Sequence, residues 1–112
     1  MITQPDQFDP ITLEILWDRL VAITDEIVAS LVRTSFSINV REGYDLSCIL
    51  FDVKGRTLAQ GTYSVPSFTG TAPQTLRRML AEYPPDTLSP GDVIVTNDPW
   101  IGSGHLPDVT MA

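Results

Sequence analysis

The sequence has 112 residues, a formal net charge of −7 and an apolar content of 43%. This length predicts one domain, residues 1–112, and the apolar content is typical of a globular protein. The 14 acidic against 7 basic residues exclude a nucleic-acid partner, which would need clusters of Lys and Arg. No run of about 18 apolar residues could cross a membrane and no secretory signal is visible, so we expect a cytoplasmic protein.

The first predicted element is a helix of about 25 residues within FDPITLEILWDRLVAITDEIVASLVRTSFS. Asp9 has the side chain of a helix cap, and Pro10 suits the first helical position. Apolar residues then recur at steps of four, three, four and four, which places them on one face of the helix. They are Leu16, Leu20, Ile23, Ile27 and Leu31. We expect this apolar stripe to contact the core or a partner.

A β-hairpin is predicted after the polar stretch SINVREGYD, which interrupts the helical pattern. The strand Leu46–Val53 is rich in β-forming residues, Lys54-Gly55 supplies a tight turn, and Arg56–Gln60 returns. Cys48 lies in the apolar run LSCILF, which favours a small buried core residue over a nucleophile. Because it is the single cysteine, it can form no disulfide within the chain.

The second half of the chain predicts a loop, a helix and two strands. We expect a loop at TYSVPSFTGTAP and a short helix at PQTLRRMLAEYPP, closed by a double proline. One side of that helix carries Leu76, Met79, Leu80 and Tyr83. A strand is predicted at Asp92–Thr96, then a loop from Asn97, then a further strand in DVTMA. The predicted fold is therefore α+β, with a long N-terminal helix, a hairpin, a second short helix and a further strand.

The loop NDPWIGSGHLPD contains the chain's one histidine and is the strongest candidate for chemistry. His105 and Asp108 form an H-x-x-D pair, and a turn at Pro107 could bring both side chains to one ion. Zinc, manganese and iron accept imidazole and carboxylate ligands. Asp98 is a candidate third ligand, or a group that orients His105. The alternative is a loop histidine whose polar atoms are satisfied locally.

Three further residues are candidates for substrate binding. Gly102 and Gly104 flank Ser103 and could aim backbone N–H groups at an anion or a substrate oxygen, although glycines also mark tight turns. Arg41 could grip a carboxylate, or it could form a structural salt bridge. No glycine motif for phosphate or dinucleotide binding occurs, and we assign no residue as catalytic.

Three stretches carry a resemblance to a known family: DPITLEILWDRLVAITDEI, SINVREGYDLSCILFDVKGRTLAQ and LSPGDVIVTNDPWIGSGHLPDVTMA. In order and spacing they resemble the N-terminal part of the hydantoinase B/oxoprolinase family. The resemblance implies the B-type half of an ATP-dependent enzyme whose relatives open hydantoins, 5-oxoproline or lactams, or carboxylate ketones. It also implies a hydantoinase A-like partner that uses ATP to phosphorylate the carbonyl of a small-molecule substrate.

The same resemblance assigns His105 and Asp108 to the family's H-x-x-D metal ligands. A divalent zinc, manganese or iron ion would polarise a carbonyl or lower the pKa of a bound water. Two departures from the family pattern are visible. A further histidine ligand in an HH-type segment is absent, and Phe68 stands where the family often carries histidine. We therefore expect the N-terminal part of a larger B-type fold, which holds metal weakly by itself.

Three functions remain open at this point. The first is part of an ATP-dependent amidohydrolase that opens hydantoin-like or lactam rings, with metal-activated water attacking the phosphorylated carbon. The second is a component of an ATP-dependent ketone carboxylase, with bicarbonate or CO₂ in place of water. The third is a truncated, non-catalytic module that docks onto sister subunits. The first two place the chain in a hetero-oligomer with a hydantoinase A-like subunit.

Overall fold

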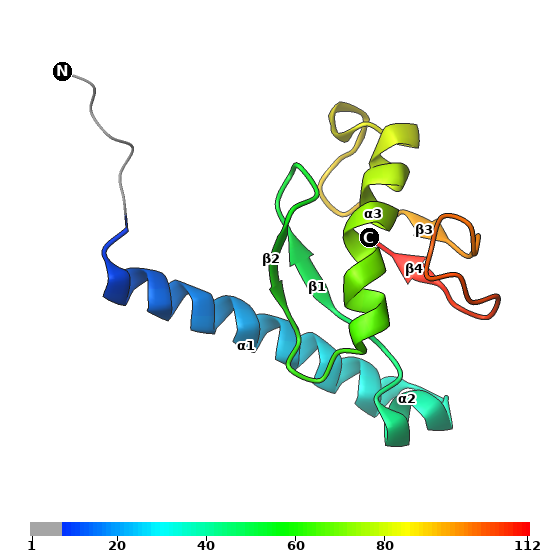
Figure 1. Cartoon of the computed structure of the whole chain (residues 1–112), viewed down its shortest axis with the longest axis horizontal. Coiled ribbons are helices and arrows are strands. Elements are labelled where there is room, and N and C mark those ends of the chain that lie inside the picture. Colours follow the sequence, from blue (N-terminus) through cyan, green and yellow to red (C-terminus); the bar gives the residue numbers. More distant parts are fainter. Residues whose placement is uncertain (1–7) are drawn as a thin grey trace.

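The structure is a computed structural model that describes residues 8–112. Two small antiparallel sheets combine with three helices in this range, so the predicted α+β fold is confirmed (Figure 1). The elements are α1 (Pro10–Thr34), α2 (Ile38–Gly43), β1 (Ile49–Phe51), β2 (Thr57–Gln60), α3 (Pro66–Glu82), a 3-10 turn (Pro85–Thr87), β3 (Val95–Thr96) and β4 (Thr110–Met111). The start of the predicted domain and the expected lack of a secretory signal fall partly on residues 1–7, which lie outside the described residues.

Helix α1 begins where the sequence predicts, because Asp9 caps it. The Asp9 carboxylate accepts hydrogen bonds from the backbone N–H of Ile11 (3.1 Å) and of Thr12 (3.0 Å), and Pro10 is the first helical residue. The hydrogen bond from the Thr12 hydroxyl is the largest of the causes that lower the pKa of Asp9. The cap prediction is confirmed.

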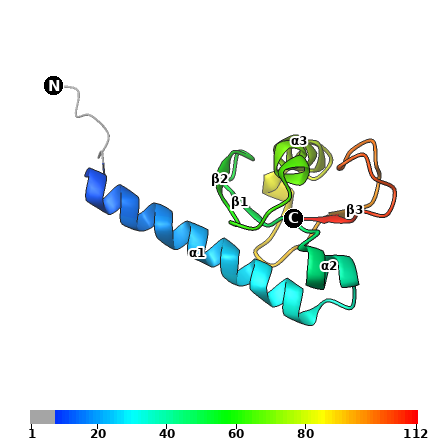
Figure 2. The same ribbon diagram turned by 60° about the horizontal axis from the view of Figure 1, so that its bottom comes forward.

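The core is formed by the C-terminal half of α1, the β1–β2 hairpin and α3. Its buried apolar residues are Val28, Cys48, Ala59 and Met79. Burial of Cys48 confirms its prediction as a core residue, and that burial raises the pKa of the thiol. The N-terminal half of α1 extends beyond the rest of the molecule (Figures 1 and 2). No helix within residues 8–112 combines the length and apolar character that a membrane crossing requires.

The apolar stripe predicted on α1 does not form the core. Thr24 and Val28 are the buried residues of this helix, and the Thr24 hydroxyl is satisfied by the Val21 carbonyl (2.7 Å). The hairpin packs onto this face, and it can do so because position 61 is a glycine. A Cβ at Gly61 would lie 2.8 Å from Cγ2 of Val28. The stripe therefore lies beside the buried face and is largely exposed, with Leu20 half-buried at its edge.

The β1–β2 hairpin is confirmed but is shorter than predicted. Leu50 pairs with Ala59 and Phe51 with Thr57, so the register shifts between these pairs. The Asp52 carboxylate accepts hydrogen bonds from the backbone N–H of Lys54 and of Arg56, both 2.9 Å, and from Arg56 Nε (2.6 Å). These contacts, the Arg56 backbone N–H first among them, lower the pKa of Asp52. Near the turn, hydrogen bonds to the Asp52 carboxylate take the place of the strand-to-strand hydrogen bonds that the longer predicted hairpin would have.

The loop predicted at TYSVPSFTGTAP is confirmed for its first four residues only, because α3 already begins at Pro66. Pro66 occupies the first turn, where its missing N–H costs no helical hydrogen bond. The hydroxyls of two threonines in this stretch donate to helix carbonyls, with Thr69 bonding Pro66 (2.9 Å) and Thr71 bonding Ser67 (3.1 Å). Pro73 lies inside the helix.

Two other segments differ from expectation in detail. The polar stretch SINVREGYD does break α1, but it contains the short helix α2, capped by Ser37 and closed by Tyr44 at a φ of 51°. The strand predicted at Asp92–Thr96 is limited to β3, which pairs antiparallel with β4. The strand predicted in DVTMA is β4 and is confirmed.

Candidate functional site

The loop that carries His105 joins β3 to β4 and is closed at its base by their pairing. Val95 pairs with Met111 and Thr96 with Thr110. Backbone hydrogen bonds between Ile94 and Ala112, 2.8 and 2.9 Å long, extend this ladder by one pair. The loop is thus presented by a strand pair rather than by a free tail.

Helix α3 holds the loop from the side through two backbone carbonyls. The Thr75 hydroxyl donates to the Ile101 carbonyl (3.0 Å), and Thr75 is only 2% exposed. Arg78 Nη1 donates to the Trp100 carbonyl (2.5 Å). The two carbonyls lie next to each other in the chain, so α3 fixes one short part of the loop at two consecutive points.

His105 and Asp108 lie together, as the H-x-x-D spacing predicts. Nδ1 of His105 is 3.3 Å from Oδ2 of Asp108, and the side chains are 60% and 30% exposed. The same Oδ2 accepts a hydrogen bond from the Ser103 hydroxyl. The Nδ1 edge of the imidazole therefore lies beside the Asp108 carboxylate, so both side chains face the same point of the loop.

Phe68 lies against the same imidazole. Its ring centroid is 6.1 Å from that of His105, at an interplanar angle of 70°. An edge-on aromatic contact of this kind limits how the imidazole can turn. Phe68 reaches His105 because it belongs to α3, where residues 68, 71, 75 and 78 follow one another at helical spacing on the side that faces the loop.

The structure does not bring Asp98 together with this pair in the manner of a third ligand. Its Oδ1 accepts a hydrogen bond from the Trp100 N–H (2.9 Å), and its carbonyl accepts from the N–H of Ile101 (3.1 Å) and of Gly102 (2.9 Å). Asp98 thereby closes the first turn of the loop. Within residues 8–112 no three His, Cys, Asp or Glu side chains gather as a metal site would require.

Two of the three candidate substrate-binding residues, Gly102 and Gly104, shape the backbone of the loop. The N–H of Gly102 is used in the turn with Asp98, and a Cβ there would lie 3.3 Å from the Asp98 carbonyl. Gly104 has a φ of +89°, a backbone conformation that favours glycine. Arg41 is exposed on α2 and forms no salt bridge with any other residue from 8 to 112. The salt-bridge interpretation of Arg41 is therefore unsupported among these residues.

His105 and Asp108 fit one part of a divalent metal site. They offer an imidazole nitrogen and a carboxylate oxygen, the ligand types that zinc, manganese and iron accept. A catalytic site of this kind ordinarily takes three protein ligands. In such a site a third ligand would have to come from a residue that does not lie beside this pair in residues 8–112.

Sequence reasoning missed the residues that hold the loop. Thr75 and Arg78 were not predicted, because each contacts a backbone carbonyl more than 20 residues away. Ser103 was seen only as the residue between two glycines. One signal was available for these residues. Polar side chains recur on one side of the helix, at Thr71, Thr75 and Arg78.

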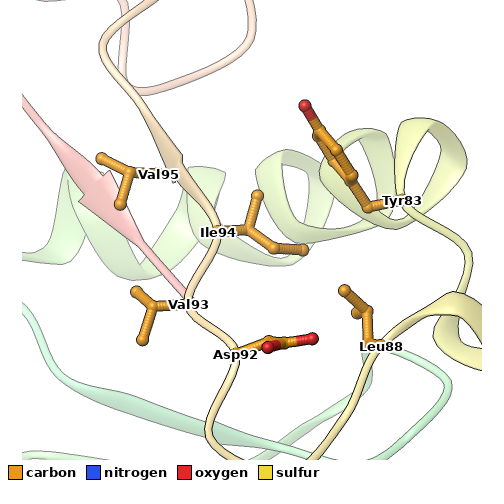
Figure 3. A pocket seen from close by; sticks show the side chains of 6 residues that line it. All are labelled: Tyr83, Leu88, Asp92, Val93, Ile94 and Val95. Atoms are coloured by element: carbon orange, nitrogen blue, oxygen red, sulfur yellow. The ribbon is translucent and has the colours of Figure 1, made fainter.

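A separate hollow lies between the C-terminal end of α3 and β3 (Figure 3). Ile94 points toward Tyr83 and Leu88, whereas Val93 and Val95 point to the other side of the strand. Its one carboxylate, on Asp92, accepts a hydrogen bond from the Ser89 N–H (2.8 Å). This hollow contains none of the predicted site residues.

The fold and the loop together define an α+β unit that presents a His–Asp pair on a clamped strand-connecting loop. The family model for hydantoinase B/oxoprolinase matches residues 9–112, and the chain belongs to this family.

Similar proteins support this membership. The putative B subunit of the D-/L-hydantoinase of Pseudomonas sp. (strain NS671) is 36% identical over 109 residues, which cover 96% of this chain and 18% of that protein. The 5-oxoprolinase of Saccharomyces cerevisiae is 42% identical over 103 residues, covering 92% of this chain and 8% of the relative. The 5-oxoprolinase 1 of Arabidopsis thaliana is 38% identical with the same coverage of both chains.

The chain thus spans between 8% and 18% of the length of these relatives. Comparison with solved structures gave no significant match.

Proposed function

We propose that the protein takes part in the ATP-dependent opening of a cyclic amide of the hydantoin, lactam or 5-oxoproline type. Membership of the hydantoinase B/oxoprolinase family supports this proposal, as do relatives named as a hydantoinase B component and as 5-oxoprolinases. In this scheme a hydantoinase A-like subunit uses ATP to phosphorylate the ring carbonyl. The chain contributes from the B-type side of the resulting hetero-oligomer, in the cytoplasm where ATP is supplied.

The observation that carries the proposal is the His105–Asp108 pair on its clamped loop. These two residues would hold a divalent zinc, manganese or iron ion, with the third ligand supplied from elsewhere in the assembly. Such an ion polarises a carbonyl or activates a water for attack on the ring carbon. Within this chain, the Asp108 carboxylate lies beside Nδ1 of the imidazole and the Phe68 ring lies edge-on to it. Arg41 and the glycines 102 and 104 remain candidates for contact with the substrate.

Metal content tests this assignment directly. The protein is purified with a hydantoinase A-like subunit, and zinc, manganese and iron are measured in the wild type and in His105→Ala and Asp108→Asn. Both variants should lose metal, whereas Asp18→Asn, which changes an exposed carboxylate on α1, should keep it. Asp98→Asn then decides whether Asp98 is a ligand or only closes the turn. Unchanged metal in His105→Ala would remove this residue from the site.

Substrate turnover separates the candidate functions. The same complex is given ATP with hydantoin, 5-oxoproline, or acetone plus bicarbonate, and phosphate release and product are followed. Ring opening supports the proposal, and turnover of the ketone alone would replace it with a carboxylase. Binding to the partner without turnover of any substrate would instead support a non-catalytic docking module.

A further inference from the structure

The hydroxyl of Ser103 contacts both members of the His105–Asp108 pair. It donates a hydrogen bond to Oδ2 of Asp108, and its oxygen accepts one from the backbone N–H of His105 (3.4 Å). The same Oδ2 lies 3.3 Å from Nδ1 of His105. Ser103 therefore connects the backbone of one proposed metal ligand to the carboxylate of the other.

The backbone on either side explains why the side chain at position 103 is the one that reaches Asp108. The N–H of Gly102 is bound to the Asp98 carbonyl (2.9 Å), and a Cβ at position 102 would lie 3.3 Å from that same oxygen. Gly104 has a φ of +89°, which disfavours any side chain. Ser103 has no such positive φ, so it is the residue of this Gly-Ser-Gly segment that best accommodates a side chain. That side chain is half-buried.

The rest of the loop brings Asp108 back to Ser103. The Asp108 N–H donates to the His105 carbonyl (3.4 Å), which closes a turn over residues 105–108. Helix α3 holds the loop directly before this segment, through hydrogen bonds to the carbonyls of Trp100 and Ile101. The Ser103 hydroxyl thus projects from a fixed part of the loop onto the carboxylate that returns to it.

The distance between His105 and Asp108 suits two ligands of one ion. Zinc holds nitrogen and oxygen ligands at about 2.0–2.1 Å in a tetrahedral arrangement, which sets any two of them roughly 3.3 Å apart. Nδ1 of His105 and Oδ2 of Asp108, 3.3 Å apart, already have this spacing. Each oxygen of an ionised carboxylate has two lone pairs, so Oδ2 can accept the hydroxyl proton and still bind a cation.

We propose that Ser103 is a positioning residue of the metal site, whose hydroxyl holds the Asp108 carboxylate beside the His105 imidazole. The inference rests on the proposed function, because it needs the divalent ion that these two residues would hold. A carboxylate already held in place loses less rotational freedom when it binds the ion, so the affinity for metal increases. Ser103 itself does not contact the ion in this arrangement.

Metal titration of the complex with a hydantoinase A-like subunit tests the proposal. The complex is stripped of metal and titrated with zinc or manganese in competition with a chelator. Ser103→Ala should weaken binding by about tenfold or more, the effect typical of removing a hydrogen-bond partner of a metal ligand. Ser103→Thr keeps the hydroxyl and should bind nearly as tightly as the wild type. Ser67→Ala is the control, because Ser67 is exposed on α3 and its hydroxyl forms no hydrogen bond with any residue from 8 to 112.

Two readouts separate a positioning role from a general loosening of the loop. Cobalt(II) in place of zinc gives a visible spectrum that depends on the geometry of its ligands, so Ser103→Ala should change the spectrum and Ser103→Thr should not. Hydrogen exchange at Ile101 and Gly102 should stay as in the wild type in Ser103→Ala, because α3 still holds the loop.

The outcomes distinguish this inference from the proposed function beneath it. Wild-type affinity in Ser103→Ala, together with loss of metal in His105→Ala, would overturn the role of Ser103 and leave the metal site in place. Metal retained in His105→Ala would overturn both. Equal losses in Ser103→Ala and Ser103→Thr would also contradict the inference, because the hydroxyl would not be the cause.

Discussion

Replacing Thr75 with valine removes one hydroxyl from the buried face of α3 while keeping the shape of the side chain. In the wild type this hydroxyl donates to the Ile101 carbonyl (3.0 Å) and to the Thr71 carbonyl (3.2 Å). The variant leaves the Ile101 carbonyl without its donor at a position where Thr75 is 2% exposed. It also frees one of the two points at which α3 holds the loop of His105.

The cost follows from these contacts. A net hydrogen bond contributes about 1 kcal/mol, and a buried carbonyl left without a donor costs about 1–3 kcal/mol. The Thr71 carbonyl remains in the helix, so we expect Thr75→Val to lower the free energy of unfolding by about 1.5–2 kcal/mol. That is a change of roughly ten- to thirtyfold in the folding equilibrium.

Urea unfolding followed by circular dichroism measures this loss. Thr71→Val is the matched control, because the Thr71 hydroxyl donates only within α3, to the carbonyls of Ser67 and Phe68. It should cost about 0.5 kcal/mol or less. Hydrogen exchange should quicken at Ile101 and Gly102 in Thr75→Val alone. Equal stabilities of the two variants, with unchanged exchange in the loop, would refute the role of Thr75 as a clamp.

Three further predictions concern packing, acid stability and metal affinity. Gly61→Ala should lower the free energy of unfolding in urea by about 1–3 kcal/mol, because its Cβ would lie 2.8 Å from Val28, whereas Gly70→Ala, in open space on α3, should raise it by about 0.5–1 kcal/mol. Similar changes in stability for the Gly61 and Gly70 variants would contradict the close approach of Gly61 to Val28. The lowered pKa of Asp52 means that its stabilising contribution is complete above the ordinary value of 3.8 and is lost as the pH falls toward the lower folded-state value. Asp52→Asn should therefore flatten the curve of stability against pH below about pH 4, and an unchanged slope would argue against this linkage. Phe68→His places a second imidazole where the rings now lie 6.1 Å apart, so calorimetry should show zinc binding about tenfold tighter, and no gain would exclude a shared site.

Local signals in the sequence were reliable where they act over a few residues. The cap by Asp9, the hairpin turn after Asp52 and the meeting of His105 with Asp108 each depend on contacts within four positions. The loop predicted over residues 66–73 failed because proline and glycine are counted as loop residues. Here Pro66 begins a helix and the threonine hydroxyls bond to that helix's own carbonyls.

The order of residues was enough to predict the α+β class, the family resemblance and the candidate metal-binding pair His105 and Asp108. Periodicity also identified the apolar stripe on α1, but it could not say whether the core or solvent would meet it. That choice depends on which face the hairpin covers, and the close approach at Gly61 places the hairpin over Thr24 and Val28. Folding likewise determines how the loop is held, because Thr75 and Arg78 bond to carbonyls that come to α3 only in the folded chain. Contacts between residues far apart in sequence leave no local pattern, and these contacts position the candidate site.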